Sequence, residues 1–217
     1  MKVCTDSSIF GAWTEPVKTE EHFRVLDIGT GTGLLSLMLA QRYENAEIDA
    51  IEIDEDAYLQ AKENFLQSPW ADRLNATHSD ICDFPLKEKY DFILSNPPFF
   101  HLSLKSPNQR VNMARHVHTL NEINLVQVID KHLNDKGSFS LMISFEHRAI
   151  YLQAAQKAGW FSWKELWLRQ TPAHGYFRAF IQFRKQSLKP EKLEMCIKEN
   201  NTTYSDTYYK LMKDYLL

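Results

Sequence analysis

The sequence predicts an α/β protein with a seven-stranded, mostly parallel sheet, helices on both faces and an antiparallel hairpin at the C-terminal end. Two observations predict this class. Short apolar runs alternate with helical segments along most of the chain, which is the order that builds a parallel sheet covered on both faces. The last two apolar runs are joined by the short stretch 171–176, and so short a connection permits an antiparallel pair but no parallel crossover.

Seven strands are expected from their apolar composition and from the turn residues that bound them. The first run, FRVLDIG, ends in Gly29, and the last two runs alternate apolar and polar residues in the manner of strands. The expected ranges are 23–29, 46–53, 74–79, 90–95, 137–145, 161–169 and 177–184.

Four helices are expected between these strands, at 33–43, 54–67, 121–133 and 148–159. The first has a helix-forming composition. Asp54 stands where the second needs an N-cap, and Pro69 lies beyond its end. The third has apolar residues at helical spacing, and Gly159 closes the fourth.

The length and composition predict one domain over residues 1–217, with an N-terminal helical segment at 1–20 and a C-terminal extension at 186–217. Hydrophobic residues make up 44% and charged residues 24%, which excludes a disordered chain and a disulfide-framed mini-protein. Cys4, Cys82 and Cys196 are far apart, so we expect no disulfide framework, no metal site and a reducing, cytoplasmic location. No apolar stretch is long enough for a signal peptide or a membrane span.

The net charge of −3 conceals an uneven distribution. Residues 1–100 hold 8 Lys/Arg and 18 Asp/Glu, whereas residues 101–217 hold 17 Lys/Arg and 10 Asp/Glu. Two halves of opposite sign suggest that different faces have different partners, although ordinary solvated helix faces would give the same counts.

A glycine-rich motif, VLDIGTGTG (25–33), combines a strand, Asp27 and three alternating glycines, Gly29, Gly31 and Gly33, before a helix. Glycine lets the backbone approach a ligand closely, and the N-terminus of the following helix offers free N–H groups. A dinucleotide site would have G-x-G-x-x-G spacing, whereas the spacing here is G-x-G-x-G. This variant resembles motif I of S-adenosylmethionine (SAM) methyltransferases, in which the acid and the loop hold the methionine end of the cofactor.

Acidic residues follow the second and third expected strands. Glu52 can accept hydrogen bonds from both ribose hydroxyls, a demand that NAD and SAM share. The stretch IEIDEDAYLQAKEN resembles the methyltransferase segment that carries this acid. The resemblance also implies that Asp80 meets the adenine amino group of SAM and that the backbone near Ile81 frames the ring. Either acid alone would also suit a solvated loop.

The sharpest signal is YDFILSNPPF (90–99), in which an apolar strand leads into Asn96, Pro97, Pro98 and Phe99. The two prolines fix φ and remove two N–H donors, so the carbonyl groups of the turn stay available as acceptors. The run resembles motif IV, (Asn/Asp/Ser)-Pro-Pro-(Tyr/Phe/Trp), of methyltransferases that modify planar or amide nitrogens.

The chemistry of such a nitrogen explains these residue types. The lone pair of adenine N6 is delocalised into the ring, so the amine is a poor nucleophile. Hydrogen bonds from its two N–H groups to Asn96 Oδ1 and the Pro97 carbonyl would orient the lone pair and stabilise the positive charge that develops on nitrogen. Phe99 would stack on a flipped base.

Three substrate classes share motif IV: adenine N6 or cytosine N4 in nucleic acid, guanine N2 in ribosomal RNA, and glutamine in release factors. The segment 101–118 carries Lys105, Arg110 and Arg115 and no acid, which suits phosphate contacts. Residues 160–192, which include Arg178, add seven Lys/Arg against two Asp/Glu. We therefore favour RNA over protein glutamine. A non-catalytic SAM- or RNA-binding module is disfavoured because every residue that the chemistry needs is present.

Longer segments extend the resemblance over essentially the whole chain. Residues 2–13, 67–74 and 201–217 resemble the tRNA1(Val) adenine-37 N6-methyltransferase family. This implies a Rossmann-like class I fold, SAM as cofactor, tRNA as substrate and Thr5 near the methionine end of SAM; we expect a monomer. The family has glycine where this chain has Cys4 and Ser7. Family members also carry residues before this stretch, so we expect an N-terminally shortened chain.

Overall fold

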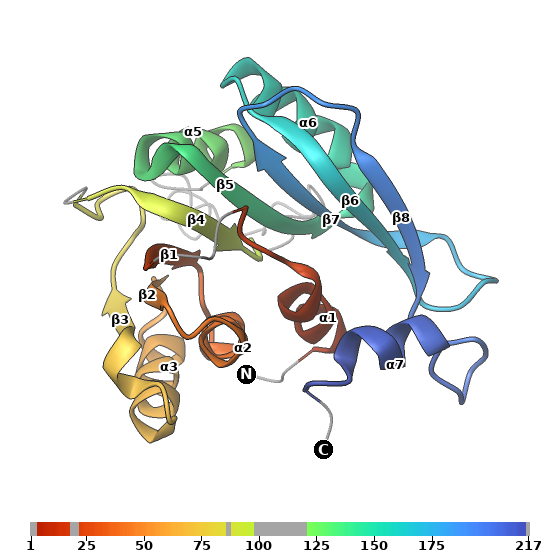
Figure 1. The fold of residues 1–217 in the computed structure, drawn as a ribbon, viewed down its shortest axis with the longest axis horizontal. Coiled ribbons are helices and arrows are strands. Elements are labelled where there is room, and N and C mark those ends of the chain that lie inside the picture. Colours follow the sequence, from red (N-terminus) through yellow and green to blue (C-terminus); the bar gives the residue numbers. More distant parts are fainter. Residues whose placement is uncertain (1–3, 18–21, 86–87, 98–120, 216–217) are drawn as a thin grey trace, which may run out of the picture.

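The computed structural model describes residues 4–17, 22–85, 88–97 and 121–215 (Figure 1). One sheet of eight strands runs through this part of the chain in the order β3-β2-β1-β4-β5-β7-β6-β8. The strands are β1 (Phe23–Ile28), β2 (Ala46–Glu52), β3 (Leu74–His78), β4 (Tyr90–Ser95), β5 (Leu133–Ser144), β6 (Phe161–Arg169), β7 (Tyr176–Arg184) and β8 (Glu191–Cys196). The helices are α1 (Thr5–Trp13), α2 (Leu34–Arg42), α3 (Glu55–Gln67), α5 (Glu122–His132), α6 (Arg148–Lys157) and α7 (Asp206–Met212), with 3-10 turns η1 (Ala71–Arg73) and η2 (Phe145–His147).

The strand directions confirm the predicted class. Strands β3, β2, β1, β4 and β5 pair in parallel, and β7 pairs antiparallel with both β5 and β6. The two antiparallel pairings make β6 parallel to β5. The C-terminal ends of β1 to β6, with the start of β7, therefore lie at one edge of the sheet, where ligands of such folds bind.

The sheet has one strand more than expected. Strand β8 pairs in parallel with β6 from Lys164–Glu191 to Arg169–Cys196 and lies within the expected C-terminal extension. The sequence did not predict it because its first four residues are exposed and it buries Met195 alone. Strand β5 also begins at Leu133, before the expected residue 137, because Leu133 pairs with Tyr90 ahead of an irregularity at which β5 has extra residues relative to β4.

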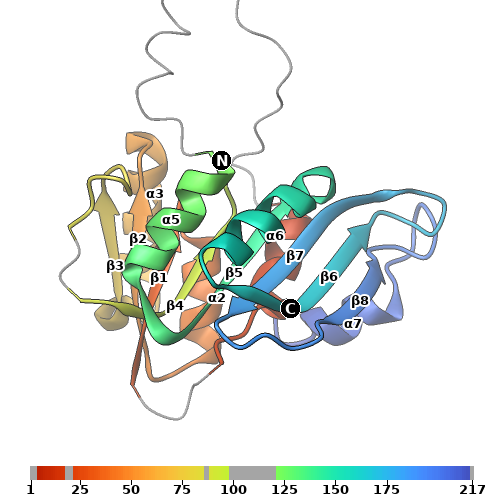
Figure 2. The same cartoon turned by 90° about the horizontal axis from the view of Figure 1, so that it is seen from above.

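Helices cover both faces of the sheet (Figures 1 and 2). Each covered face has its own apolar cluster. Phe92 and Phe180 pack in the cluster that includes residues of α1, α2, α3 and α7. Ile93 and Ile181 pack with residues of α5 and α6. Neighbouring strand residues point to opposite faces, which explains why the central strands are apolar throughout.

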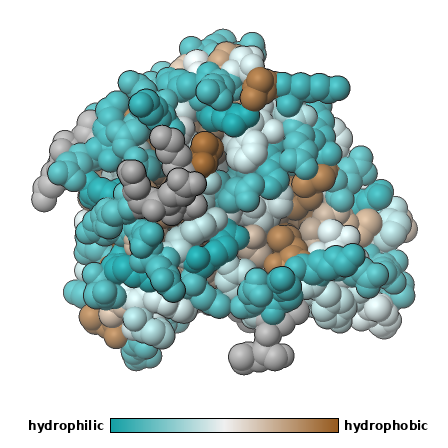
Figure 3. Space-filling model, in the orientation of Figure 1, coloured by the Kyte–Doolittle hydropathy of each residue, from teal (hydrophilic) through white to brown (hydrophobic). Residues whose placement is uncertain are grey.

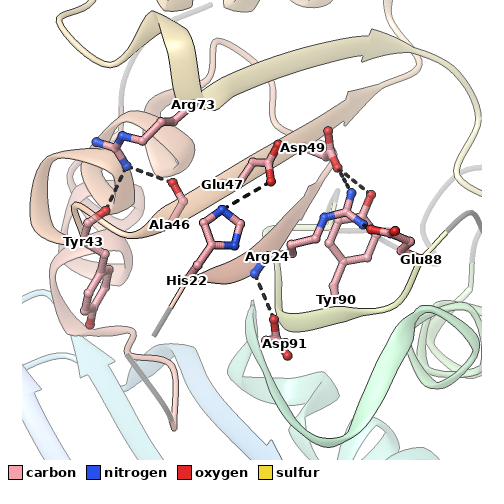
Figure 4. A network of polar contacts seen from close by, with 10 residues as sticks. All are labelled: His22, Arg24, Tyr43, Ala46, Glu47, Asp49, Arg73, Glu88, Tyr90 and Asp91. Atoms are coloured by element: carbon pink, nitrogen blue, oxygen red, sulfur yellow. Dashed lines mark hydrogen bonds and ion pairs between the residues drawn. The ribbon is translucent and has the colours of Figure 1, made fainter. Parts of the chain in front are cut away.

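A polar network joins the N-terminal parts of β1, β2 and β4, away from the ligand-binding edge (Figure 4). The guanidinium of Arg24 lies 2.9 Å from Asp49 Oδ2 and 2.7 Å from Glu88 Oε2. The Tyr90 hydroxyl donates to Asp49 at 2.8 Å, and the Arg24 backbone N–H donates to Asp91 at 2.9 Å. These contacts fix the strands from which the ligand-binding edge extends.

Candidate functional site

The glycine loop between β1 and α2 has three residues in the left-handed region, Gly29, Gly31 and Gly33, with φ of +71°, +60° and +83°. A Cβ on Gly33 would lie 2.4 Å from Phe65 Cε1, so this glycine is required by the packing of α3 against the loop. A Cβ on Gly29 would have no atom within 4 Å. Gly29 therefore leaves bare backbone beside open space, as a ligand-binding loop requires.

Asp27 is the last residue but one of β1, and its side chain is fully buried. Its Oδ2 accepts hydrogen bonds from the hydroxyls of Thr30 at 2.6 Å and Ser36 at 2.7 Å. Its Oδ1 has no hydrogen-bond partner among the described residues. Burial raises the pKa of Asp27 to about 6, against the effect of the two hydroxyls. An unpartnered carboxylate oxygen beside the glycine loop fits a cationic group of a ligand.

Glu52 ends β2 and braces the glycine loop. Its Oε2 accepts the Gly31 N–H at 2.8 Å, and its Oε1 accepts the N–H groups of Ile53 at 2.9 Å and Asp54 at 3.0 Å. Asp54 caps α3, as predicted, because its Oδ1 accepts the Ala57 N–H at 2.9 Å. Glu52 is therefore the acid that faces the loop.

Asp80 and Ile81 follow β3 at the same edge. The Ser79 N–H donates to the Glu52 backbone carbonyl at 3.0 Å, which joins this turn to the end of β2. Asp80 Oδ1 accepts the Cys82 N–H at 2.8 Å, and the side chain of Ile81 is buried. The fold thus brings together Asp27, the three glycines, Glu52, Asp80 and Ile81, the residues proposed from the sequence to hold the cofactor.

Asn96 lies directly after β4, which pairs with β1 in the sheet. Its Nδ2 is 3.4 Å from Ser7 Oγ. Its Oδ1 is buried and has no hydrogen-bond partner among the described residues. A buried acceptor of this kind fits a donor supplied by a ligand. Pro97 follows and is also buried.

The other predicted residues of this motif and its basic neighbour, Pro98, Phe99, Lys105, Arg110 and Arg115, lie outside the described residues.

Helix α1 brings a further group of polar side chains to Asn96. The Ser7 backbone N–H donates to Asp6 Oδ1 at 3.0 Å, and Arg178 Nε lies 2.9 Å from Asp6 Oδ2. Arg178, predicted to contact RNA, thus forms an ion pair that is largely shielded from solvent. Thr5 is exposed at the start of the helix.

The site also contains polar residues to which the sequence assigned no role, namely Ser7, Thr30, Ser36 and Asn64. The Asn64 side chain donates to the Thr32 carbonyl at 2.8 Å and fixes the loop. The threonines within GTGTG were a usable signal. The contact between Ser7 and Asn96 had no signal in the sequence, apart from the fact that the family has glycine at the position of Ser7.

Among the described residues, no group of three or more His, Cys, Asp and Glu could hold a metal ion. No described helix is both long and apolar enough to cross a membrane.

The chain is similar to known methyltransferases in sequence and in fold. The family model "Methyltransferase small domain" matches residues 13–149. A tRNA1(Val) (adenine(37)-N6)-methyltransferase of Dyadobacter fermentans is 37% identical over 221 residues, which cover 100% of this chain and 91% of the relative. The protein of the same name from Bacteroides fragilis strain ATCC 25285 is 39% identical with the same coverage.

Solved structures show the same fold. A predicted O-methyltransferase from Agrobacterium tumefaciens superposes with a TM-score of 0.70, at 15% identity and with 95% of each chain covered. The full-length similarity to the curated relatives shows more than the fold: the chain belongs to the tRNA1(Val) (adenine(37)-N6)-methyltransferase family.

Proposed function

We propose that this protein transfers the methyl group of SAM to N6 of an adenine in tRNA, with adenine 37 of tRNA1(Val) as the target. The observation that carries the proposal is the position of Asn96, whose unpartnered Oδ1 follows β4. Strands β4 and β1 are neighbours in the sheet. The backbone that carries Asn96 therefore leaves β4 about 5 Å, one strand spacing, from the end of β1, which leads into the glycine loop.

The residues around the loop fit SAM. Asp27 Oδ1 would accept a hydrogen bond from the ammonium group, and the bare backbone at Gly29 would lie against the methionine end. Glu52 would bind the ribose hydroxyls. The adenine would lie beside the buried side chain of Ile81, with Asp80 accepting from its amino group. When bound, SAM would supply an electrophilic methyl group: the C–S bond of its sulfonium breaks as the new C–N bond forms, and the cofactor leaves as the neutral thioether S-adenosylhomocysteine.

The chain's own contribution is to orient the target amine. Asn96 Oδ1 and the Pro97 carbonyl would accept its two N–H groups, which turns the nitrogen lone pair toward the methyl group. The same acceptors would stabilise the positive charge that develops on nitrogen. Pro98 would keep the turn free of a competing N–H donor, and Phe99 would stack on the flipped base. No strong base is needed, because the methylated ammonium loses its proton readily.

The RNA would be held in part by Lys105, Arg110 and Arg115 through phosphate contacts. Thr5, at the start of α1, would lie near the methionine end of SAM. We further propose that the protein acts as a monomer in the cytoplasm and needs no metal ion.

The test is incubation of unmodified tRNA with methyl-labelled SAM, followed by analysis of the nucleosides. Label in N6-methyladenosine supports the proposal. Label in N2-methylguanosine, or in a release-factor glutamine offered as a competing substrate, contradicts it. Replacing Asn96 by alanine should lower kcat by about 100-fold or more while the SAM Kd stays within about twofold, because the side chain stabilises charge that develops only during transfer. Loss of SAM binding as well would mean that Asn96 has a structural role instead.

A further inference from the structure

We infer that a cluster of aromatic and basic side chains at the C-terminal ends of β5 and β6 receives the RNA strand beside the target adenine. We call this cluster the aromatic–basic edge. It comprises Phe145, Trp167, Tyr176, Arg148, Arg169 and Lys192. The inference rests on the proposed function, since it names the surface that holds the same substrate.

The three rings of the aromatic–basic edge contact one another. The centroids of Phe145 and Trp167 are 5.3 Å apart, those of Phe145 and Tyr176 are 5.1 Å apart, and those of Trp167 and Tyr176 are 5.6 Å apart. All three residues are partly buried and partly exposed to solvent. Partly exposed aromatic rings are the groups on which nucleic-acid bases stack.

Basic groups lie over these rings. Arg148 Cζ is 4.9 Å and Lys192 Nζ is 5.6 Å from the centroid of Trp167. Arg169 Cζ is 5.4 Å from the centroid of Tyr176. The rings and the cations therefore share one surface, on which a base could stack while a neighbouring phosphate meets a positive charge.

The charges at this edge are only partly compensated. Arg148 pairs with buried Glu165 at 2.8 Å. Exposed Glu194 accepts a hydrogen bond from the Tyr176 hydroxyl, and Arg169 Nε donates to Cys196 Sγ at 3.2 Å. Among the described residues neither Arg169 nor Lys192 forms an ion pair. Two cations are thus available for a partner's negative charges.

Other basic side chains on these strands already form ion pairs with acidic residues. Lys164 pairs with Glu15 at 2.7 Å, and Arg178 pairs with Asp6 at 2.9 Å. The surface drawn in Figure 3 has small, separate apolar areas rather than one broad apolar patch. The available chemistry of the aromatic–basic edge is therefore positive charge beside aromatic rings, which fits a single-stranded RNA segment.

The aromatic–basic edge also lies on the correct side of the sheet. Arg169 ends β6, Phe145 follows β5, and Asn96 follows β4, so all three occupy the same edge (Figure 1). The strand order β4-β5-β7-β6 places β6 three spacings from β4, about 14 Å across the sheet. A few nucleotides next to a base held at Asn96 can cover that distance.

The other end of the same strands provides a matched control. Trp163 precedes Trp167 by four residues on β6, and Arg184 Cζ lies 4.9 Å from a Trp163 ring centroid. This pair has the same chemistry as Trp167 with its cations. The pair of Trp163 and Arg184 lies toward the N-terminal end of β6, away from Asn96. Replacing either residue should therefore leave tRNA binding unchanged.

The experiment measures tRNA binding and SAM binding by the full chain. The double variant Arg169→Gln/Lys192→Gln should weaken tRNA binding by about 10-fold and lower the slope of log Kd against log salt by about 1 to 2, because two phosphate contacts are lost. Trp167→Leu should weaken tRNA binding without changing the slope. The controls Arg184→Gln and Trp163→Leu should leave the tRNA Kd within about twofold.

Trp167 packs against the apolar cluster that includes residues of α5 and α6, so its replacement can also disturb folding. The test is therefore decided by Arg169→Gln/Lys192→Gln and Arg184→Gln, and the SAM Kd of each variant reports whether it is folded. The inference is overturned if wild type methylates tRNA while Arg169→Gln/Lys192→Gln binds it as tightly as Arg184→Gln does. Failure of the proposed function would look different, because wild type itself would then transfer no label to adenine.

Discussion

At the scale of single residues, Asp27 is buried, and only one of its two carboxylate oxygens accepts hydrogen bonds from described residues. Two hydroxyls donate to Oδ2, no described group donates to Oδ1, and burial raises the pKa to about 6 from 3.8. At about 1.4 kcal/mol for each pKa unit, the ionised carboxylate costs the folded protein about 3 kcal/mol at neutral pH. That cost is consistent with a group that is maintained for ligand binding.

The sign of this effect predicts the behaviour of Asp27→Asn. Above pH 6 the carboxylate is ionised in both the folded and the unfolded chain, so the full cost applies and the variant should be more stable than wild type by up to about 3 kcal/mol. As the pH falls from 6 toward 4, the folded protein takes up the proton first and the advantage should disappear. Urea unfolding of both proteins at pH 7.5 and pH 4.5 measures this; a variant that is less stable at pH 7.5 contradicts it.

The same residue predicts a pH dependence of SAM binding. Below pH 6 a protonated Asp27 loses its attraction for the ammonium group, so the affinity of wild type for SAM should fall as the pH is lowered through 6. Asp27→Asn should bind SAM about 10-fold more weakly at pH 7.5, since a charged hydrogen bond is lost. Calorimetric titration across this pH range should give a much flatter profile for the variant, and equal slopes would exclude Asp27 as the titrating group.

The glycine loop supplies a matched pair of substitutions. Gly33→Ala combines a left-handed backbone with a clash against Phe65 and should cost about 3 kcal/mol of stability. Gly29→Ala bears only the backbone strain, about 1 kcal/mol, because its Cβ meets no protein atom. Thermal melts with and without SAM separate the two: Gly29→Ala should fold but show little SAM-dependent stabilisation. A SAM-induced shift equal to that of wild type would mean that no ligand approaches Gly29.

At the scale of elements, the polar network around Arg24 should stabilise strand pairing without taking part in transfer (Figure 4). Arg24→Gln leaves Asp49 and Glu88 without their cation and should lower the free energy of unfolding by about 2 kcal/mol. The kcat and KM for tRNA should stay near those of wild type below the melting temperature, because the network lies away from the ligand-binding edge. A large change in kcat at unchanged stability would contradict this separation.

The strands that could be predicted from the sequence are those whose buried residues form a run of apolar side chains. Strands β1 and β4 are buried on both faces and appear as apolar runs, and Asp54 has the spacing of a helix cap. Strand β8 exposes four of its six residues, so no apolar pattern marks it.

The predictability of the site follows the same rule. Asp27, Glu52 and Asn96 could be proposed from the sequence because each lies near the end of a strand or directly after one and forms part of a compact local motif. The partners of Asn96 and Arg178 come from α1, which is distant in the sequence. Only the packing of that helix reveals these contacts, and RNA binding by Arg178 stays a prediction beside its ion pair with Asp6.

At the scale of the whole molecule, the uneven charge separates the two binding events. The chain has a net charge of −3, yet residues 101–217 hold 17 Lys/Arg against 10 Asp/Glu. If RNA meets this half, raising the salt concentration from 50 to 200 mM should weaken tRNA binding by about 10-fold or more, since three or more condensed counterions are released on binding.

SAM binding should change by less than about twofold over the same range, because it depends on buried groups that salt screens little. Parallel titrations of tRNA and SAM at four salt concentrations measure both slopes. A tRNA affinity as insensitive to salt as the SAM affinity would show that phosphate contacts contribute little, and recognition would then have to depend on base stacking at Trp167 and Tyr176 and on the hydrogen bonds at Asn96.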